Sequence, residues 1–102
     1  MLVSLKMTLH IDLSPSIIIT DVERIYEWLS DIKDVALSYS GVCGIQYFIV
    51  YIDEDFSVPG NTSLKELDNL VKEKANAHIE KVRRALDKHI KYDMKVKYKY
   101  NF

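Results

Sequence analysis

Residues 3–13 alternate strictly between apolar and polar side chains. Apolar residues occupy the odd positions from Val3 to Leu13, and polar residues occupy the even positions between them. A period of two is typical of a β-strand with one buried face. The sequence therefore predicts a strand over 3–13, which Ser14-Pro15-Ser16 would end.

A helical period follows this strand. Thr20 and Glu23 have the spacing of a capping box, in which Glu23 reaches back to the Thr20 amide. Apolar side chains then recur every three or four residues and form one stripe. This pattern predicts a helix from Asp21 to Tyr39, with Ser40-Gly41 marking its end.

Residues 45–52, with the sequence IQYFIVYI, are apolar at both odd and even positions except at Gln46. A strand has this composition when neither face meets bulk water, so we expect it to be the central strand. The acidic run 53–55 and Pro59-Gly60-Asn61 predict a loop after it. Carboxylates after a strand can gather a divalent ion, but no further element completes a nuclease site, and a polar turn is favoured.

The rest of the chain predicts a second helix and a last strand. Ser63 and Glu66 form another capping box, and a long apolar stripe follows it to about Lys91. From Tyr92 to Phe102 the period returns to two. The polar face of this last strand is rich in lysine.

The element order predicts an α+β fold with two layers, in which two helices cover one face of a small open three-stranded sheet. Strand–helix–strand crossovers are almost always right-handed. If the first and last strands flank 45–52, both helices therefore lie on the same face. The 102 residues are expected to form a single domain. Residues 1–40 and 41–102 share the order strand, turn and capped helix, which suggests an internal repeat. Chance reuse of the same turn and capping residues is the alternative.

The other sheet face would be left bare. We expect the tyrosine side of IQYFIVYI to point there, because tyrosine exposes a hydroxyl together with a large apolar ring. Such a patch, of several hundred Å², usually meets a partner. The leading hypothesis is that the chain binds a protein or peptide partner at the open face, at a sheet edge or in the groove between the two motifs. A second copy of the chain could cover the same surface and form a homodimer. The expected contact residues are Ile45, Tyr47, Ile49, Tyr51, Tyr98 and Tyr100.

Weak nucleic-acid binding is the alternative function, because lysines and arginines occur near rings that can stack on bases. The residues that would carry it are Arg83, Arg84, Lys95, Lys97 and Lys99. Glu80 and Asp87 lie one helical turn from basic neighbours and can neutralise them. Lysines on an outer strand also act as guards against edge-to-edge aggregation.

No catalytic or metal-binding residue and no cofactor are expected, so the protein is predicted not to be an enzyme. His10 and Asp12 lie on one strand face and would provide two metal ligands without a third. His78 and His89 are separated by roughly 16 Å along a helix and cannot share an ion. Cys43 has no neighbouring histidine or basic residue that would activate it as a nucleophile.

Composition narrows the cellular context. Fourteen basic and fifteen acidic residues give a net charge of −1, which does not indicate a nucleic-acid or membrane protein. The single cysteine excludes an internal disulfide, and no stretch resembles a signal peptide or a membrane span. An intracellular location without membrane contact is therefore expected.

The stretches SIIITDVERIYEWL and IKYDMKVKYKYNF, the short length and the single cysteine resemble the small orphan proteins of filamentous viruses of hyperthermophilic archaea, of the Acidianus type. The resemblance is one of composition along the whole chain and carries no motif. It implies a host-cytoplasmic, heat-stable protein, with adaptor or protein-binding roles as the common expectation.

Overall fold

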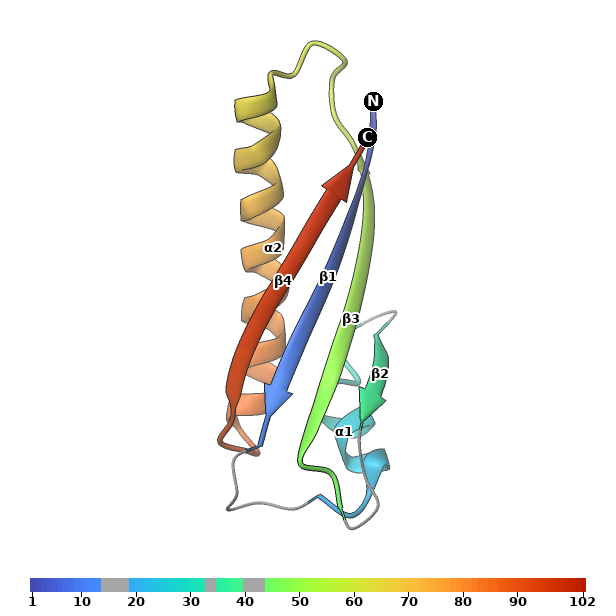
Figure 1. Cartoon of the computed structure of the whole chain (residues 1–102), viewed down its shortest axis with the longest axis vertical. Helices are drawn as coiled ribbons and strands as arrows, with labels where there is room; N and C mark the ends of the chain where they lie inside the picture. The colour runs from blue at the N-terminus through green and yellow to red at the C-terminus, as the bar shows by residue number, and fades with distance from the viewer. Residues whose placement is uncertain (14–18, 33–34, 40–43) are drawn as a thin grey trace.

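The computed structural model describes residues 1–13, 19–32, 35–39 and 44–102. The molecule is elongated, with extents of 51 × 22 × 20 Å, and its longest helix runs beside the sheet (Figure 1). In chain order the elements are β1 (Leu2–Asp12), α1 (Val22–Trp28), β2 (Ala36–Tyr39), β3 (Tyr47–Ser57), α2 (Leu64–Asp87) and β4 (Asp93–Asn101).

The four strands form one open sheet in the order β2-β3-β1-β4, and all neighbours are antiparallel. β1 and β2 therefore run parallel with β3 between them, and β3 and β4 run parallel with β1 between them. This interleaving is the split βαβ arrangement of ferredoxin-like folds. The predicted α+β class is confirmed, but the sheet has four antiparallel strands rather than three.

The predicted long helix 21–39 is wrong in its second half. α1 ends at Trp28, and residues 36–39 form β2 instead. The reason is tertiary pairing: Leu37 lies opposite Val50 of β3 and turns its side chain towards the core. The helix also begins one residue later than predicted, because the Asp21 carboxylate accepts a hydrogen bond from the Glu23 amide at 3.0 Å and acts as the N-cap.

β3 is an interior strand, as predicted for 45–52, but the first and last strands do not flank it, because β1 lies between β3 and β4. β1 pairs with β3 along its whole length and with β4 from Ser4 to Asp12, whereas β3 pairs with β2 only over 48–51. β1 therefore has neighbours on both sides over most of its length, and β3 has neighbours on both sides over 48–51. The predicted loop at 53–55 is wrong as well, since β3 continues to Ser57 opposite Leu2.

One core lies between the sheet and the helices. The odd-numbered residues of β1 are buried, as the alternation predicts, and Phe48, Val50 and Ile52 of β3 join them. The helices contribute Ile25 of α1 and five residues of α2, namely Leu67, Val71, Ala75, Val82 and Leu86. Both helices therefore cover the same sheet face, and the strands pass in front of α2 in Figure 1.

α2 is anchored at both ends. Its N-cap Ser63 accepts a hydrogen bond from the Glu66 amide at 3.1 Å, as the capping box predicts. Near the other end, the Tyr92 hydroxyl donates to Asp87 at 2.6 Å. Burial, together with this hydrogen bond and the Asp87 charge, raises the pKa of Tyr92 to about 12. The helix ends at Asp87, four residues before the predicted end.

The halves 1–40 and 41–102 each contain a strand, a helix and a second strand. A shared ancestry for these halves stays a prediction, because a common order of elements does not require a common origin. Cys43, Ser14-Pro15-Ser16 and Ser40-Gly41 lie outside the described residues.

Candidate functional site

The sheet face away from the helices carries the side chains that the core does not use. It is formed by even-numbered residues of β1 and odd-numbered residues of β3 and β4. Two rows of neighbouring side chains run across the three strands on this face. One row is Ile49, His10 and Lys95, and the other is Tyr51, Thr8 and Lys97. The face therefore combines rings, an aliphatic side chain, a hydroxyl and two cations.

The aromatic part of this face is exposed. Tyr47 and Tyr51 keep 37% and 39% of their surface accessible, and Ile49 between them is half-buried. The His10 ring stacks on Tyr47 with centroids 4.9 Å apart and planes 15° apart. The predicted outward orientation of the tyrosine side of β3 is thus confirmed for Tyr47, Ile49 and Tyr51.

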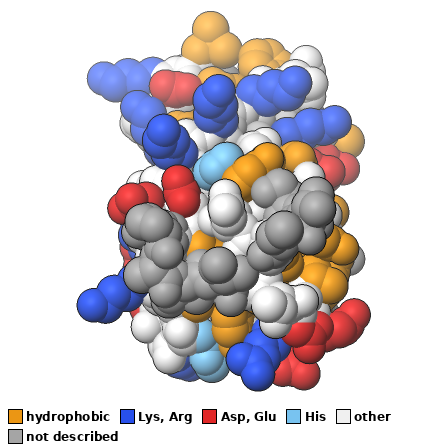
Figure 2. Space-filling model, turned by 60° about the horizontal axis from the view of Figure 1, so that its bottom comes forward, with side chains coloured by type: hydrophobic (Ala, Val, Ile, Leu, Met, Phe, Trp, Pro, Cys, Tyr) orange, Lys and Arg blue, Asp and Glu red, His pale blue; other side chains and the backbone are white. Residues whose placement is uncertain are grey.

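A hollow of about 330 Å³ lies beside this aromatic part. It forms because Thr8 and His10 of β1 are shorter than the flanking lysines of β4. Its lining residues are Thr8, His10, Ile49, Lys95 and Lys97. Neither lysine has an ion-pair partner among the described residues. Figure 2, where the front of Figure 1 is turned upwards, shows basic and hydrophobic side chains gathered on this side.

Three expected contact residues lie elsewhere. Ile45 precedes β3 and is only 4% exposed, because it bridges to Ile19 and joins the core. Tyr98 and Tyr100 belong to the helix-facing side of β4, since they lie opposite buried residues of β1. Tyr98 stays 40% exposed there, while the Tyr100 hydroxyl donates to Asp68 of α2 at 2.8 Å. The expected set is therefore divided between two faces.

The basic residues are divided in the same way. Lys95, Lys97 and Lys99 lie on the open face, with Lys6 of β1 next to Lys99. Arg83 and Arg84 belong to α2 in the helix layer, so they lie on the opposite side of the sheet. A single nucleic-acid surface made of all five predicted residues is excluded by this separation.

The sheet also has two free edges within the described residues. The outer side of β4 has no neighbouring strand, and the outer side of β3 has none from Ile52 to Ser57 (Figure 1). Lysines mark the first edge, as the sequence predicts for an edge guard. Asp53 and Asp55 of the second edge share the open face, and Asp55 accepts a hydrogen bond from Ser4 at 2.7 Å.

Glu54 lies between these aspartates but points to the helix side. It contacts Lys74 Nζ at 2.8 Å and His78 Nε2 at 2.6 Å, both on α2. The acidic run 53–55 is thus split between two faces, with Asp53 and Asp55 on the open face and Glu54 on the helix side. Within the described ranges, no three histidine, cysteine or acidic side chains are grouped so that they could hold a metal ion.

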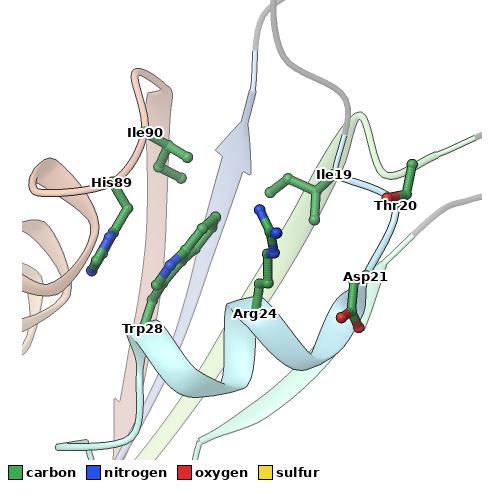
Figure 3. A pocket seen from close by; sticks show the side chains of 7 residues that line it. All are labelled: Ile19, Thr20, Asp21, Arg24, Trp28, His89 and Ile90. Carbon is green, nitrogen blue, oxygen red and sulfur yellow. The ribbon is translucent and has the colours of Figure 1, made fainter.

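A cavity of about 420 Å³ lies between the two halves, at the end where α1 approaches the turn after α2. Trp28 of α1 stacks on His89, with centroids 5.2 Å apart and planes 11° apart. Arg24, one helical turn before Trp28, also lines the cavity (Figure 3). Sequence reasoning missed Arg24 and Trp28, although their i,i+4 spacing was a visible signal.

In the part of the chain that the structure describes, no helix has both the length and the apolar character needed to cross a membrane. Comparisons with known proteins return no matching family model, no similar curated protein and no similar solved structure.

Proposed function

We propose that the chain is a non-enzymatic protein-interaction module that binds an extended segment of a partner protein across its open sheet face. The observation that carries this proposal is that exposed Tyr47 and Tyr51 and half-buried Ile49 lie together on a face that neither helix covers. Aromatic residues are enriched in interface cores because they bury a large area at a low entropic cost.

The charges on the open face indicate which charged side chains the partner segment should carry. Lys95 and Lys97 flank the apolar residues on one side and favour an acidic side chain of the ligand there. Asp53 and Asp55 lie further along β3, where they favour a basic side chain. The ligand that fits is an extended segment with an acidic residue, an apolar or aromatic centre and a basic residue.

The free edge of β3 adds a second type of contact. A segment that pairs with residues 52–57 would continue the line of β2 and satisfy the outward backbone groups of this edge. The β4 edge suits this role less well, because its lysines repel a further strand. Backbone pairing would supply affinity, and the tyrosine side chains would supply specificity.

A displayed library of extended peptides tests this proposal. The wild-type protein should enrich peptides with the acidic, apolar and basic order, and a Tyr47→Ser, Tyr51→Ser double variant should bind them at least about tenfold more weakly. Tyr26→Ser is the matched control, because Tyr26 is 45% exposed on α1 and lies away from this face.

Thermal unfolding confirms that each variant is folded, and light scattering measures the oligomeric state. Equal peptide affinity in the double variant contradicts the proposal. A stable dimer that dissociates in the double variant would show that a second copy, rather than a foreign segment, occupies the face.

Single-stranded nucleic acid is a second candidate, favoured by one specific observation. The hollow places Lys95 and Lys97 beside the stacked His10 and Tyr47 rings, and single strands are bound by this combination of cations and rings. Fluorescence anisotropy with a labelled oligonucleotide at several salt concentrations tests it. A Lys95→Gln, Lys97→Gln variant should have a shallower salt dependence, and no binding at low salt refutes this candidate.

A further inference from the structure

We infer that the cavity between α1 and the α2–β4 turn binds a small planar anion, meaning a ring system that carries a phosphate or carboxylate group. The site is separate from the open sheet face and lies on the helix side. Its volume of about 420 Å³ falls in the lower part of the range for small-molecule sites, which suits one ring system with a short charged arm.

Trp28 provides the stacking surface. Its indole lies between His89 and Arg24 in Figure 3, and His89 stacks on one face of the ring. The other side of the indole is turned towards Arg24 and the cavity in Figure 3. Ile19 and Ile90 are 5% and 8% exposed and line the apolar part of the same cavity. A flat ring that enters beside Arg24 would contact the indole and these aliphatic side chains.

Arg24 provides the charge. Figure 3 shows its guanidinium group reaching into the cavity between Trp28 and Ile19. No carboxylate pairs with it among the described residues. The planar fork of a guanidinium group matches the geometry of phosphate and carboxylate oxygens. A guanidinium group that has no ion-pair partner among the described residues and lies beside an indole ring suits a ligand with both an anionic group and a planar ring.

Asp21 is the acidic residue among the lining side chains, and it does not compete for Arg24. Its carboxylate accepts the hydrogen bond of the Glu23 amide and points away from the guanidinium group in Figure 3. Thr20 leaves a hydroxyl at the rim, where it can donate to a ligand oxygen. The remaining polar lining residue, His89, faces Trp28.

The fluorescence of Trp28 reports on this cavity directly, because the chain contains a single tryptophan. Adenosine monophosphate and 4-hydroxybenzoate are the probes, and they distinguish a phosphate arm from a carboxylate arm. At least one of them should quench the fluorescence in a saturable way. If adenosine monophosphate is the better probe, two fragments of it provide the comparison: adenosine lacks the phosphate and inorganic phosphate lacks the ring. Each fragment should bind at least about tenfold more weakly than adenosine monophosphate.

Arg24→Gln should weaken binding of the better probe at least about tenfold. The affinity of Arg24→Lys should lie between those of the wild type and Arg24→Gln, because lysine keeps the positive charge but lacks the planar guanidinium group. Arg84→Gln is the matched control, since Arg84 is an exposed cation of α2 outside the cavity. The indole N–H resonance of Trp28 should shift during the titration. Quenching that rises linearly without saturation, or equal affinity in Arg24→Gln and Arg84→Gln, overturns the inference.

Discussion

Replacing Glu54 with glutamine measures how firmly the middle of α2 is held against the sheet. Glu54 projects from β3 to the helix side, where it meets Lys74 at 2.8 Å and His78 at 2.6 Å. Lys74 also lies 4.6 Å from the centre of the Phe56 ring, the next helix-facing residue of β3. These contacts join β3 to the middle of α2, whereas the hydrogen bonds that Asp68 and Asp87 accept from Tyr100 and Tyr92 lie nearer the helix ends.

The expected loss of stability follows from the burial of these groups. The side chains of Glu54, Lys74 and His78 are 29%, 31% and 19% exposed, so they are neither fully solvated nor fully buried. Exposed ion pairs contribute at most about 1 kcal/mol, and hydrogen bonds to charged groups about 1.5–3 kcal/mol. Because glutamine retains shape and one acceptor, the free energy of unfolding should fall by about 1–2 kcal/mol at neutral pH.

The effect should depend on pH in a defined direction. Burial acts to raise the pKa of the Glu54 carboxyl, but the hydrogen bonds and charges of Lys74 and His78 outweigh it and bring the pKa below its ordinary value of 4.5. Ionised Glu54 therefore stabilises the fold fully above pH 4.5, and this contribution is lost as the pH falls through the lowered pKa.

Urea unfolding of the wild-type protein and Glu54→Gln, at neutral pH and at several acidic values, checks this prediction. The difference between the two should be largest at neutral pH and should shrink on acidification. Glu73→Gln is the control, because Glu73 is an exposed residue of the same helix and has no ion-pair partner among the described residues. Equal stability of wild type and Glu54→Gln, or a difference that is unchanged in acid, would refute the reasoning.

Three further predictions concern the helix ends. Ser63→Ala should lower the free energy of unfolding by about 1 kcal/mol, because α2 loses its N-cap acceptor. Asp21→Ala should lower the free energy of unfolding by a similar amount, and Thr20→Ala should lower it less, because Asp21 is the N-cap of α1. Chemical unfolding of the two variants compares these effects. The raised pKa of Tyr92, about 12 instead of 10, predicts that its ionisation lowers stability between pH 10 and about 12. Near-ultraviolet absorbance follows this ionisation, and Asp87→Asn should shift it to lower pH.

The sequence predicts best where a single side-chain period decides the structure. The alternation in 3–13 identified the buried face of β1 correctly, because every odd residue meets the helix layer. The tyrosine side of β3 was also oriented correctly, since a hydroxyl is more costly to bury than an aliphatic group. In both cases, the polarity of individual residues determines which face is covered.

Strand neighbours could not be predicted in the same way. Side-chain parity shows which face of a strand is buried, but it does not show which strands pair along its edges. β1 has one polar face and is nevertheless paired on both sides, while the more apolar β3 pairs with β2 over only four residues. The apolar composition of IQYFIVYI reflects both an interior position over 48–51 and a half-exposed patch on the open face.

The missed strand β2 has a different cause. Val35, Leu37 and Tyr39 fit a strand period, yet Val35 and Tyr39 also continue the helical stripe that begins at Val22. Local spacing does not distinguish the two interpretations over so short a segment. Pairing with residues 48–51 decides in favour of the strand, and that contact is invisible in a local pattern.

The interleaving of the halves affects how the function can be tested. The hollow on the open face takes Thr8 and His10 from the first half and Ile49, Lys95 and Lys97 from the second. The core between β1 and β3 also joins the two halves, so separating them would remove the fold and the candidate site together. Loss of binding in an isolated half would therefore carry no information. Substitutions on the open face are informative, because these side chains point away from the core and leave its packing intact.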